Sequence, residues 1–172
     1  GYERRFPTIS PEIAAVATRC TEWWDNRTAT PVATLPGLDL VLDPGRFAAA
    51  IGCKEAKITY VRYKPGMSCL VGYDTDAGLM YAKAYRREAH DKFRKAEHRG
   101  QQVLREYSVV VSRFPNDAEL EALKRLGDSR RLLTKLFKDN PELWDARVET
   151  LRYKPERRYV GKVGTKAVLK FY

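Results

Sequence analysis

The sequence predicts an α+β fold, and two observations support this prediction. Runs of alternating β-branched and aromatic residues, each long enough for three strands, occupy residues 56–85 and 147–172. Helical patterns precede the first run and fill the interval between the two, without the regular strand–helix alternation of a parallel sheet. We therefore expect antiparallel β-meanders with flanking helices.

The two β-rich runs also share a motif. Arg62-Tyr63-Lys64-Pro65 recurs as Arg152-Tyr153-Lys154-Pro155, and Ala82-Lys83-Ala84-Tyr85 is matched by Leu169-Lys170-Phe171-Tyr172. An internal repeat of this kind indicates a duplicated structural unit. Two copies are too few for a solenoid, so we expect two related β-units, either separate or paired into one sheet.

The chain before the first β-rich run is predicted to be helical. The Ser-Pro-Glu run at 10–12 has a capping residue, a proline at the first helical position and an early acid, which together predict a helix to about Trp24. Residues 26–42 contain prolines and glycine and are expected to form an irregular connection. Asp43 then caps a short predicted helix that reaches Ile51.

Each β-rich run divides into three predicted strands at its turn residues. Lys64 to Met67, with Pro65-Gly66, and residues 74–78 are the turns of the first run. The expected strands are 56–63, 68–73 and 79–85 in the first run, and 147–153, 158–163 and 167–172 in the second.

The interval between the runs is predicted to be mostly helical. Residues 86–107 are polar and contain no proline, so we expect the longest helix there, with a break allowed at Gly100. A short strand at 108–113, a turn at 114–117, leucine-rich helices on either side of 127–128 and a helical turn at 141–144 follow. The resulting segments are an N-terminal helical segment (1–55), a first unit with its helices (56–146) and the start of a second unit (147–172).

The composition is that of a globular protein with a basic surface. Of the 172 residues 44% are hydrophobic and 31% charged, and the net charge is +10. No apolar run approaches the about 20 residues that span a bilayer, and three cysteines without a CxxC pair favour reduced thiols, so we expect a cytoplasmic protein. The charge would attract nucleic acid or phosphate-bearing small molecules, although a solvated basic surface would give the same count.

Several stretches together resemble the aminoglycoside-phosphotransferase and choline-kinase-like enzymes. These stretches are VRYKPGMSCLVGYDT with LMYAKAY, then FPNDAELEALKRL, then LRYKPERRYVGKV with AVLKFY. The resemblance covers about 58–172 and is to the small lobe of a protein-kinase-like fold. It implies a lysine on the third strand that holds the phosphates of ATP or GTP, which such enzymes bind with Mg²⁺.

The resemblance assigns candidate nucleotide-binding residues in each unit. The third-strand lysine is Lys83 in the first unit and Lys170 in the second, and a helix glutamate that orients Lys83 would be Glu97 rather than Glu88. Arg157 and Arg158, in the turn of the second unit, are further phosphate ligands by the same resemblance. A lysine at a strand end is otherwise an ordinary surface residue.

The sequence lacks the catalytic part of such an enzyme. No His-Gly-Asp pattern followed by Asn and no Asp-Phe-Gly occurs, and the Asp-x-Asp sequence Asp74-Thr75-Asp76 falls in the predicted turn at 74–78, so we expect no catalytic or metal-binding residue. The preferred interpretation is a small-lobe or cap portion of a phosphotransferase, not competent alone, whose native chain continues into a large lobe.

Two other interpretations stay open. The chain could be a basic module for nucleic acid or another polyanion, in which aromatic and basic side chains alternate: Arg62, Tyr63, Lys64, Arg152, Tyr153 and Lys154. It could also be a structural domain in which the two units pair into one sheet, and self-association as a homodimer fits either role.

Overall fold

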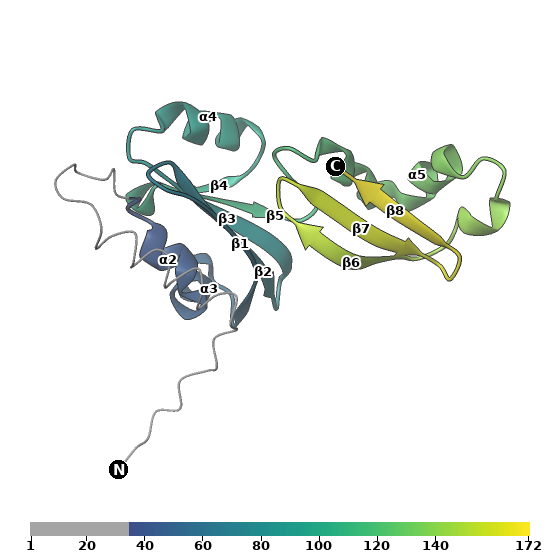
Figure 1. The fold of residues 1–172 in the computed structure, drawn as a ribbon, viewed down its shortest axis with the longest axis horizontal. Coiled ribbons are helices and arrows are strands. Elements are labelled where there is room, and N and C mark those ends of the chain that lie inside the picture. The colour runs from purple at the N-terminus through teal and green to yellow at the C-terminus, as the bar shows by residue number, and fades with distance from the viewer. Residues whose placement is uncertain (1–34) are drawn as a thin grey trace, which may run out of the picture. The chain divides into compact units, whose positions relative to one another are not determined.

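The structure of the protein is a computed structural model, and it describes residues 35–172 (Figure 1). The fold is α+β, as predicted. The α-helices are α2 (Leu38–Leu42), α3 (Pro44–Ile51), α4 (His90–His98) and α5 (Ser129–Leu136). The strands are β1 (Ala56–Lys64), β2 (Ser68–Thr75), β3 (Gly78–Tyr85), β4 (Gln102–Leu104), β5 (Val109–Arg113), β6 (Val148–Lys154), β7 (Arg158–Val163) and β8 (Ala167–Phe171). Short 3₁₀ helices are η1 (Arg105–Tyr107), η2 (Glu121–Asp128) and η3 (Pro141–Leu143).

The first β-unit forms a five-stranded antiparallel sheet in the order β1-β2-β3-β5-β4. Because side chains alternate along a strand, neighbouring residues of β5 face opposite sides of this sheet. Val109 and Val111 pack in the core beneath α2 and α3, where Phe47 stacks on Tyr73 with ring centroids 3.9 Å apart. Val110 faces the other way and packs with α4. Each face of the sheet is therefore covered by helices.

The second β-unit is a separate three-stranded meander in the order β6-β7-β8. Leu132 and Leu133 of α5 pack with Val163 and Leu169 on one face of this sheet. Leu123 of η2 packs with Tyr159 of β7 in an adjoining cluster. Both units lie within a single compact body that extends to Tyr172.

The first turns of the two meanders have the same geometry. Lys64 pairs with Ser68 in one hairpin and Lys154 with Arg158 in the other, so three residues form each loop. The middle residue has φ 64° at Gly66 and φ 57° at Glu156. This left-handed conformation suits glycine and is rarely adopted by other residues. The repeat in the sequence is therefore a repeat in the backbone.

Most predicted elements are confirmed. All six strands of the two meanders form within a residue or two of their expected ends. The short helix after Asp43 is present, with the Asp43 carboxylate accepting hydrogen bonds from Gly45 N and Arg46 N. The predicted helix at 10–24 lies outside the described residues.

The predicted long helix at 86–107 is wrong. Helix α4 ends at His98, Gly100 takes a left-handed φ of 71°, and residues 102–104 become β4, paired with β5. The buried valine strand β5 supplies hydrogen-bonding partners that outweigh the weak helical pattern beyond Gly100. Two smaller differences also occur: residues 38–42, expected to be irregular, form α2, and the leucine-rich helix before 128 is 3₁₀. Of the two arrangements left open for the units, the structure has separate sheets.

Across residues 35–172, none of the helices is both long enough and apolar enough to cross a membrane.

Candidate functional site

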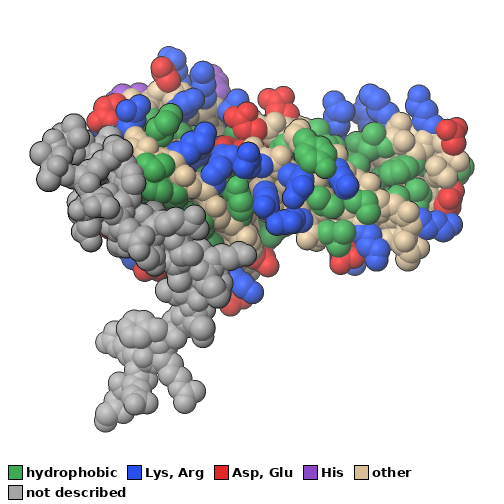
Figure 2. Space-filling model, viewed as in Figure 1, with side chains coloured by type: hydrophobic (Ala, Val, Ile, Leu, Met, Phe, Trp, Pro, Cys, Tyr) green, Lys and Arg blue, Asp and Glu red, His purple; other side chains and the backbone are tan. Residues whose placement is uncertain are grey.

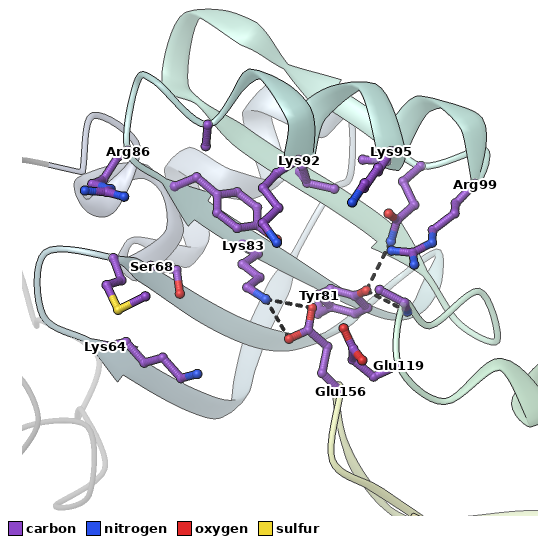
Figure 3. A pocket seen from close by; sticks show the side chains of 17 residues that line it. Lys64, Ser68, Tyr81, Lys83, Arg86, Lys92, Lys95, Arg99, Glu119 and Glu156 are labelled. Carbon is purple, nitrogen blue, oxygen red and sulfur yellow. Dashed lines mark hydrogen bonds and ion pairs between the residues drawn. The ribbon is translucent and has the colours of Figure 1, made fainter.

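A cavity of about 340 Å³ lies beside sheet strand β3 and helix α4 (Figure 3). Its charged lining is mostly basic. Six cations and two carboxylates line it: Lys64, Lys83, Arg86, Lys92, Lys95, Arg99, Glu119 and Glu156. On the face shown in Figure 2, a group of Lys and Arg side chains lies near the middle of the molecule. We call this cavity the cationic pocket.

Helix α4 supplies one wall of the cationic pocket. Phe93 and Ala96 of α4 are buried against Val110 of the sheet, which fixes the helix on this face. Lys92, Lys95 and Arg99 follow at spacings of three and four residues, the spacing that places side chains on one side of a helix. All three therefore lie along the same wall (Figure 3).

The sheet and its connections supply the opposite wall. Lys83 extends from β3, and Arg86 follows the end of that strand. Lys64 ends β1, beside the first residue of β2, Ser68. In the close view Lys64 and Arg86 lie at one end of the pocket, and Glu119 and Glu156 lie at the other (Figure 3).

Lys83 is held by a carboxylate from the second unit. Its Nζ donates to both oxygens of Glu156, at 2.9 and 2.7 Å, and Arg62 Nη2 lies 2.5 Å from Glu156 Oε2. The three side chains are only 16%, 5% and 20% exposed for Lys83, Glu156 and Arg62. The Lys83 ammonium also lies 5.2 Å from the ring centroid of Tyr85. These contacts form a largely buried ion triad.

A second buried carboxylate, that of Asp117, fixes the turn that delivers Glu156. Asp117 is 2% exposed, and its Oδ1 accepts hydrogen bonds from the backbone of Glu119 and Leu120, at 2.8 and 2.9 Å. Its Oδ2 accepts from the Tyr153 hydroxyl at 2.7 Å and from Glu156 N at 2.9 Å. Asp117 therefore joins the segment after β5 to the β6–β7 turn.

Tyrosines around these carboxylates remain neutral. Burial, followed by the nearby Asp117 carboxylate, raises the pKa of Tyr81 and Tyr153 well above the ordinary tyrosine value. Burial also raises the pKa of Tyr85. The Tyr81 hydroxyl accepts hydrogen bonds from Gln101 Nε2 and Ala118 N. Tyr81 and Tyr85 thus line the pocket as uncharged phenols.

The other pocket cations have no acidic partner among the described residues. The ion pairs found within 35–172 involve Lys83 but none of the following: Lys64, Arg86, Lys92, Lys95 and Arg99. Five like charges thus border one small cavity. Such a cavity concentrates positive potential and can bind an anion.

Of the residues predicted to bind a nucleotide, the structure brings only Lys83 into this pocket; Lys64, from the polyanion interpretation, lines it as well. Lys83 lines it, whereas Glu97 pairs with Arg105 at 2.5 Å on the outside of α4. Lys170 is exposed on β8, Arg157 is exposed in the β6–β7 turn, and Arg158 is half-buried at the start of β7. The helix glutamate expected for Lys83 is replaced by a turn glutamate of the second unit.

Sequence reasoning missed Asp117 and Glu156. The one local signal for Glu156 was the Pro-Glu turn in the second unit, where the first unit has Pro-Gly. The tyrosines of the nucleic-acid interpretation are engaged within the fold: Tyr153 donates to Asp117, and Tyr63 packs against the main core.

Comparisons with protein-family models, with curated proteins and with solved structures find no match to this chain. The fold and the pocket define an α+β protein with a cationic cavity on its first sheet.

Proposed function

We propose that the first unit binds a phosphate-bearing small molecule in the cationic pocket. The observation that supports this is the gathering around one cavity of five cations that have no acidic partner within residues 35–172. Confining like charges raises the free energy of the protein unless an anion neutralises them. Phosphate groups, with several acceptor oxygens, are the anions that clustered Lys and Arg side chains recognise.

The size of the cavity favours a small ligand over a nucleic acid. About 340 Å³ is within the range of pockets that enclose small molecules, roughly 300–1,000 Å³. Single-stranded nucleic acid binds in open grooves with exposed aromatic platforms. The two tyrosines proposed for that role are half-buried: Tyr63 packs against the main core, and the Tyr153 hydroxyl donates to Asp117.

The arrangement of the first unit further supports a nucleotide as ligand. A lysine on the third strand of a meander, followed by a helix, is the arrangement by which kinase-like proteins hold ATP phosphates. Lys83 on β3 and α4 have this order. We therefore propose ATP or GTP as candidate ligands, and a small-lobe or cap role in a phosphotransferase-like protein. The proposal is binding without turnover.

Magnesium would enter with the nucleotide. Within residues 35–172 no three His, Cys, Asp or Glu side chains form a group that could hold a metal ion. Phosphate oxygens of a nucleotide bind Mg²⁺ together with one or two carboxylates. Glu119 is the exposed carboxylate of the pocket that could contribute.

Titration calorimetry with ATP, ADP and pyrophosphate tests the proposal. The double variant Lys95→Ala/Arg99→Ala removes two pocket cations and should weaken binding about 10-fold or more, because charge-assisted hydrogen bonds contribute about 1.5–3 kcal/mol each. The matched control is Lys135→Ala/Lys138→Ala, which also removes two positive charges. Lys135 lies in α5 and Lys138 follows its end, and neither lines the cationic pocket.

Two results would count against the proposal. Equal weakening by both double variants would mean that only the net charge attracts the ligand. Tighter binding of oligonucleotides than of nucleotides, with an affinity that falls steeply with salt, would favour the nucleic-acid interpretation.

A further inference from the structure

The β6–β7 turn places a glutamate where its backbone would suit glycine. Glu156 has φ 57°, and the equivalent residue of the first unit is Gly66, with φ 64°. Glycine adopts this conformation freely, whereas a residue with a side chain does so at a cost. The cost at Glu156 is offset by contacts of its carboxylate, which is 5% exposed.

The Glu156 carboxylate lies between two cations that stand in one row across the strands of the first sheet. Arg62 of β1 pairs with Leu70 of β2, and Leu70 pairs with Lys83 of β3, so the three residues stand side by side across the strands. Their side chains therefore share a face of the sheet. Arg62 and Lys83 converge above Leu70, and Glu156 occupies the point where they meet.

We propose that Arg62 and Lys83 form an anion-binding site on the first sheet, and that Glu156 of the second unit is its internal ligand. The site takes a compact anion with two acceptor oxygens, a carboxylate or a phosphate. Glu156 uses both of its oxygens on Lys83 and one of them on Arg62 as well. Lys83 and Glu156 also line the cationic pocket, but this site uses none of the five pocket cations that lack an acidic partner among the described residues.

The turn itself is held independently of the Glu156 carboxylate. Glu156 N and the Tyr153 hydroxyl both donate to Asp117, and Pro155 is buried. Removing only the Glu156 side chain should therefore leave the turn docked and the two cations unneutralised. An anion from solution can then fill the vacated position.

The test is rescue of Glu156→Gly by acetate in thermal unfolding of the full chain at constant ionic strength. Glycine fits the turn, as Gly66 does, so the variant is expected to fold. Its melting temperature should be below that of wild type in chloride and should rise by about 2–4 °C with a saturable dependence on acetate. Wild type should show no saturable rise, because its site is filled.

Two controls locate the effect. In Glu156→Gly/Lys83→Met the acetate response should disappear, since one cation of the site is gone. Glu119→Gly removes the exposed carboxylate of the same pocket, and its melting temperature should not respond to acetate. A missing response in Glu156→Gly, or an equal response after Lys83→Met, overturns the proposal.

A second measurement covers the case in which Glu156→Gly does not fold. Glu156→Gln keeps the side-chain shape and loses the charge, so Lys83 should be methylated faster by formaldehyde and borohydride than in wild type, as read by mass spectrometry. Glu119→Gln should leave that rate unchanged. Equal rates in Glu156→Gln and wild type overturn the proposal. Neither test depends on nucleotide binding, so they separate this inference from the proposed function.

Discussion

The two hairpin turns of the protein share a backbone but differ in their surroundings. In the first turn Pro65 is exposed, Met67 is 60% exposed, and the left-handed position is Gly66. In the second turn Pro155 is buried, and Glu156 at the left-handed position reaches into the first sheet. The comparison shows that one loop geometry can serve two surroundings: the backbone of the turn is the same, and a glutamate with a distant partner stands where the other turn has glycine.

The largest expected effect comes from Asp117, which docks the second turn and has no counterpart at the first. Asp117→Ala leaves four donors without their acceptor, and buried unsatisfied donors are costly. We expect the free energy of unfolding to fall by about 3–5 kcal/mol in urea titrations. Asp91→Ala, at an exposed carboxylate of α4, is the control and should change it by less than about 0.5 kcal/mol. A small effect of Asp117→Ala would mean that the turn is not docked as described.

The coupling between Lys83 and Glu156 should be the next largest effect. A double-mutant cycle with Lys83→Met and Glu156→Gln should give about 1–3 kcal/mol, because both side chains are mostly buried. The exposed pair of Arg94 and Asp91 is the matched comparison and should give about 0.5 kcal/mol or less. Equal coupling energies at the two pairs would contradict the buried triad.

Exchanging the residue at the first turn tests the comparison directly. Gly66→Glu places a side chain in the left-handed conformation without the partners that Glu156 has, so it should cost about 1 kcal/mol. Gly66→Ala should cost a similar amount, because the backbone is the cause in both variants. Thermal and urea unfolding measure the change. A Gly66→Glu variant as stable as wild type would show that the left-handed turn imposes no penalty.

The pH dependence should give the smallest effect. Burial raises the pKa of Tyr153, so the folded protein holds this proton more tightly than the unfolded chain. The resulting stability is complete below the ordinary tyrosine value of about 10 and is lost as the pH rises beyond it. Unfolding in urea at pH 8 and pH 10.5 should show a steeper loss in wild type than in Tyr153→Phe. Parallel slopes would exclude Tyr153 as the group responsible.

Local patterns were sufficient to predict the β-meanders. Strand alternation and the Pro65 and Pro155 turns locate all six strands of the two meanders, and Asp43 locates the start of α3. The same reasoning failed at 99–107, where pairing of β4 with β5 outweighs a charged, proline-free sequence that reads as helix. Local propensity is weak where an unpaired neighbouring strand offers hydrogen bonds.

The candidate site was only partly predictable. Lys83 was identified as a site residue and lines the pocket, and the row of cations on α4 could have been found from its helical spacing. The partner of Lys83 could not be found, because Glu156 is distant in sequence and comes from the turn of another sheet. No local sequence pattern predicts which side chains of two sheets will come into contact when the sheets pack together.

The long sequence separation of the triad has a consequence for the order of folding. The strands of the first sheet up to β3 pair through short loops, whereas Arg62 and Lys83 meet Glu156 only after closure of chain segments that are 94 and 73 residues apart. Contacts between distant residues form more slowly than local ones because loop closure costs entropy. We therefore expect the first sheet to assemble with two neighbouring cations unbalanced, and to gain their counter-charge when the second hairpin closes.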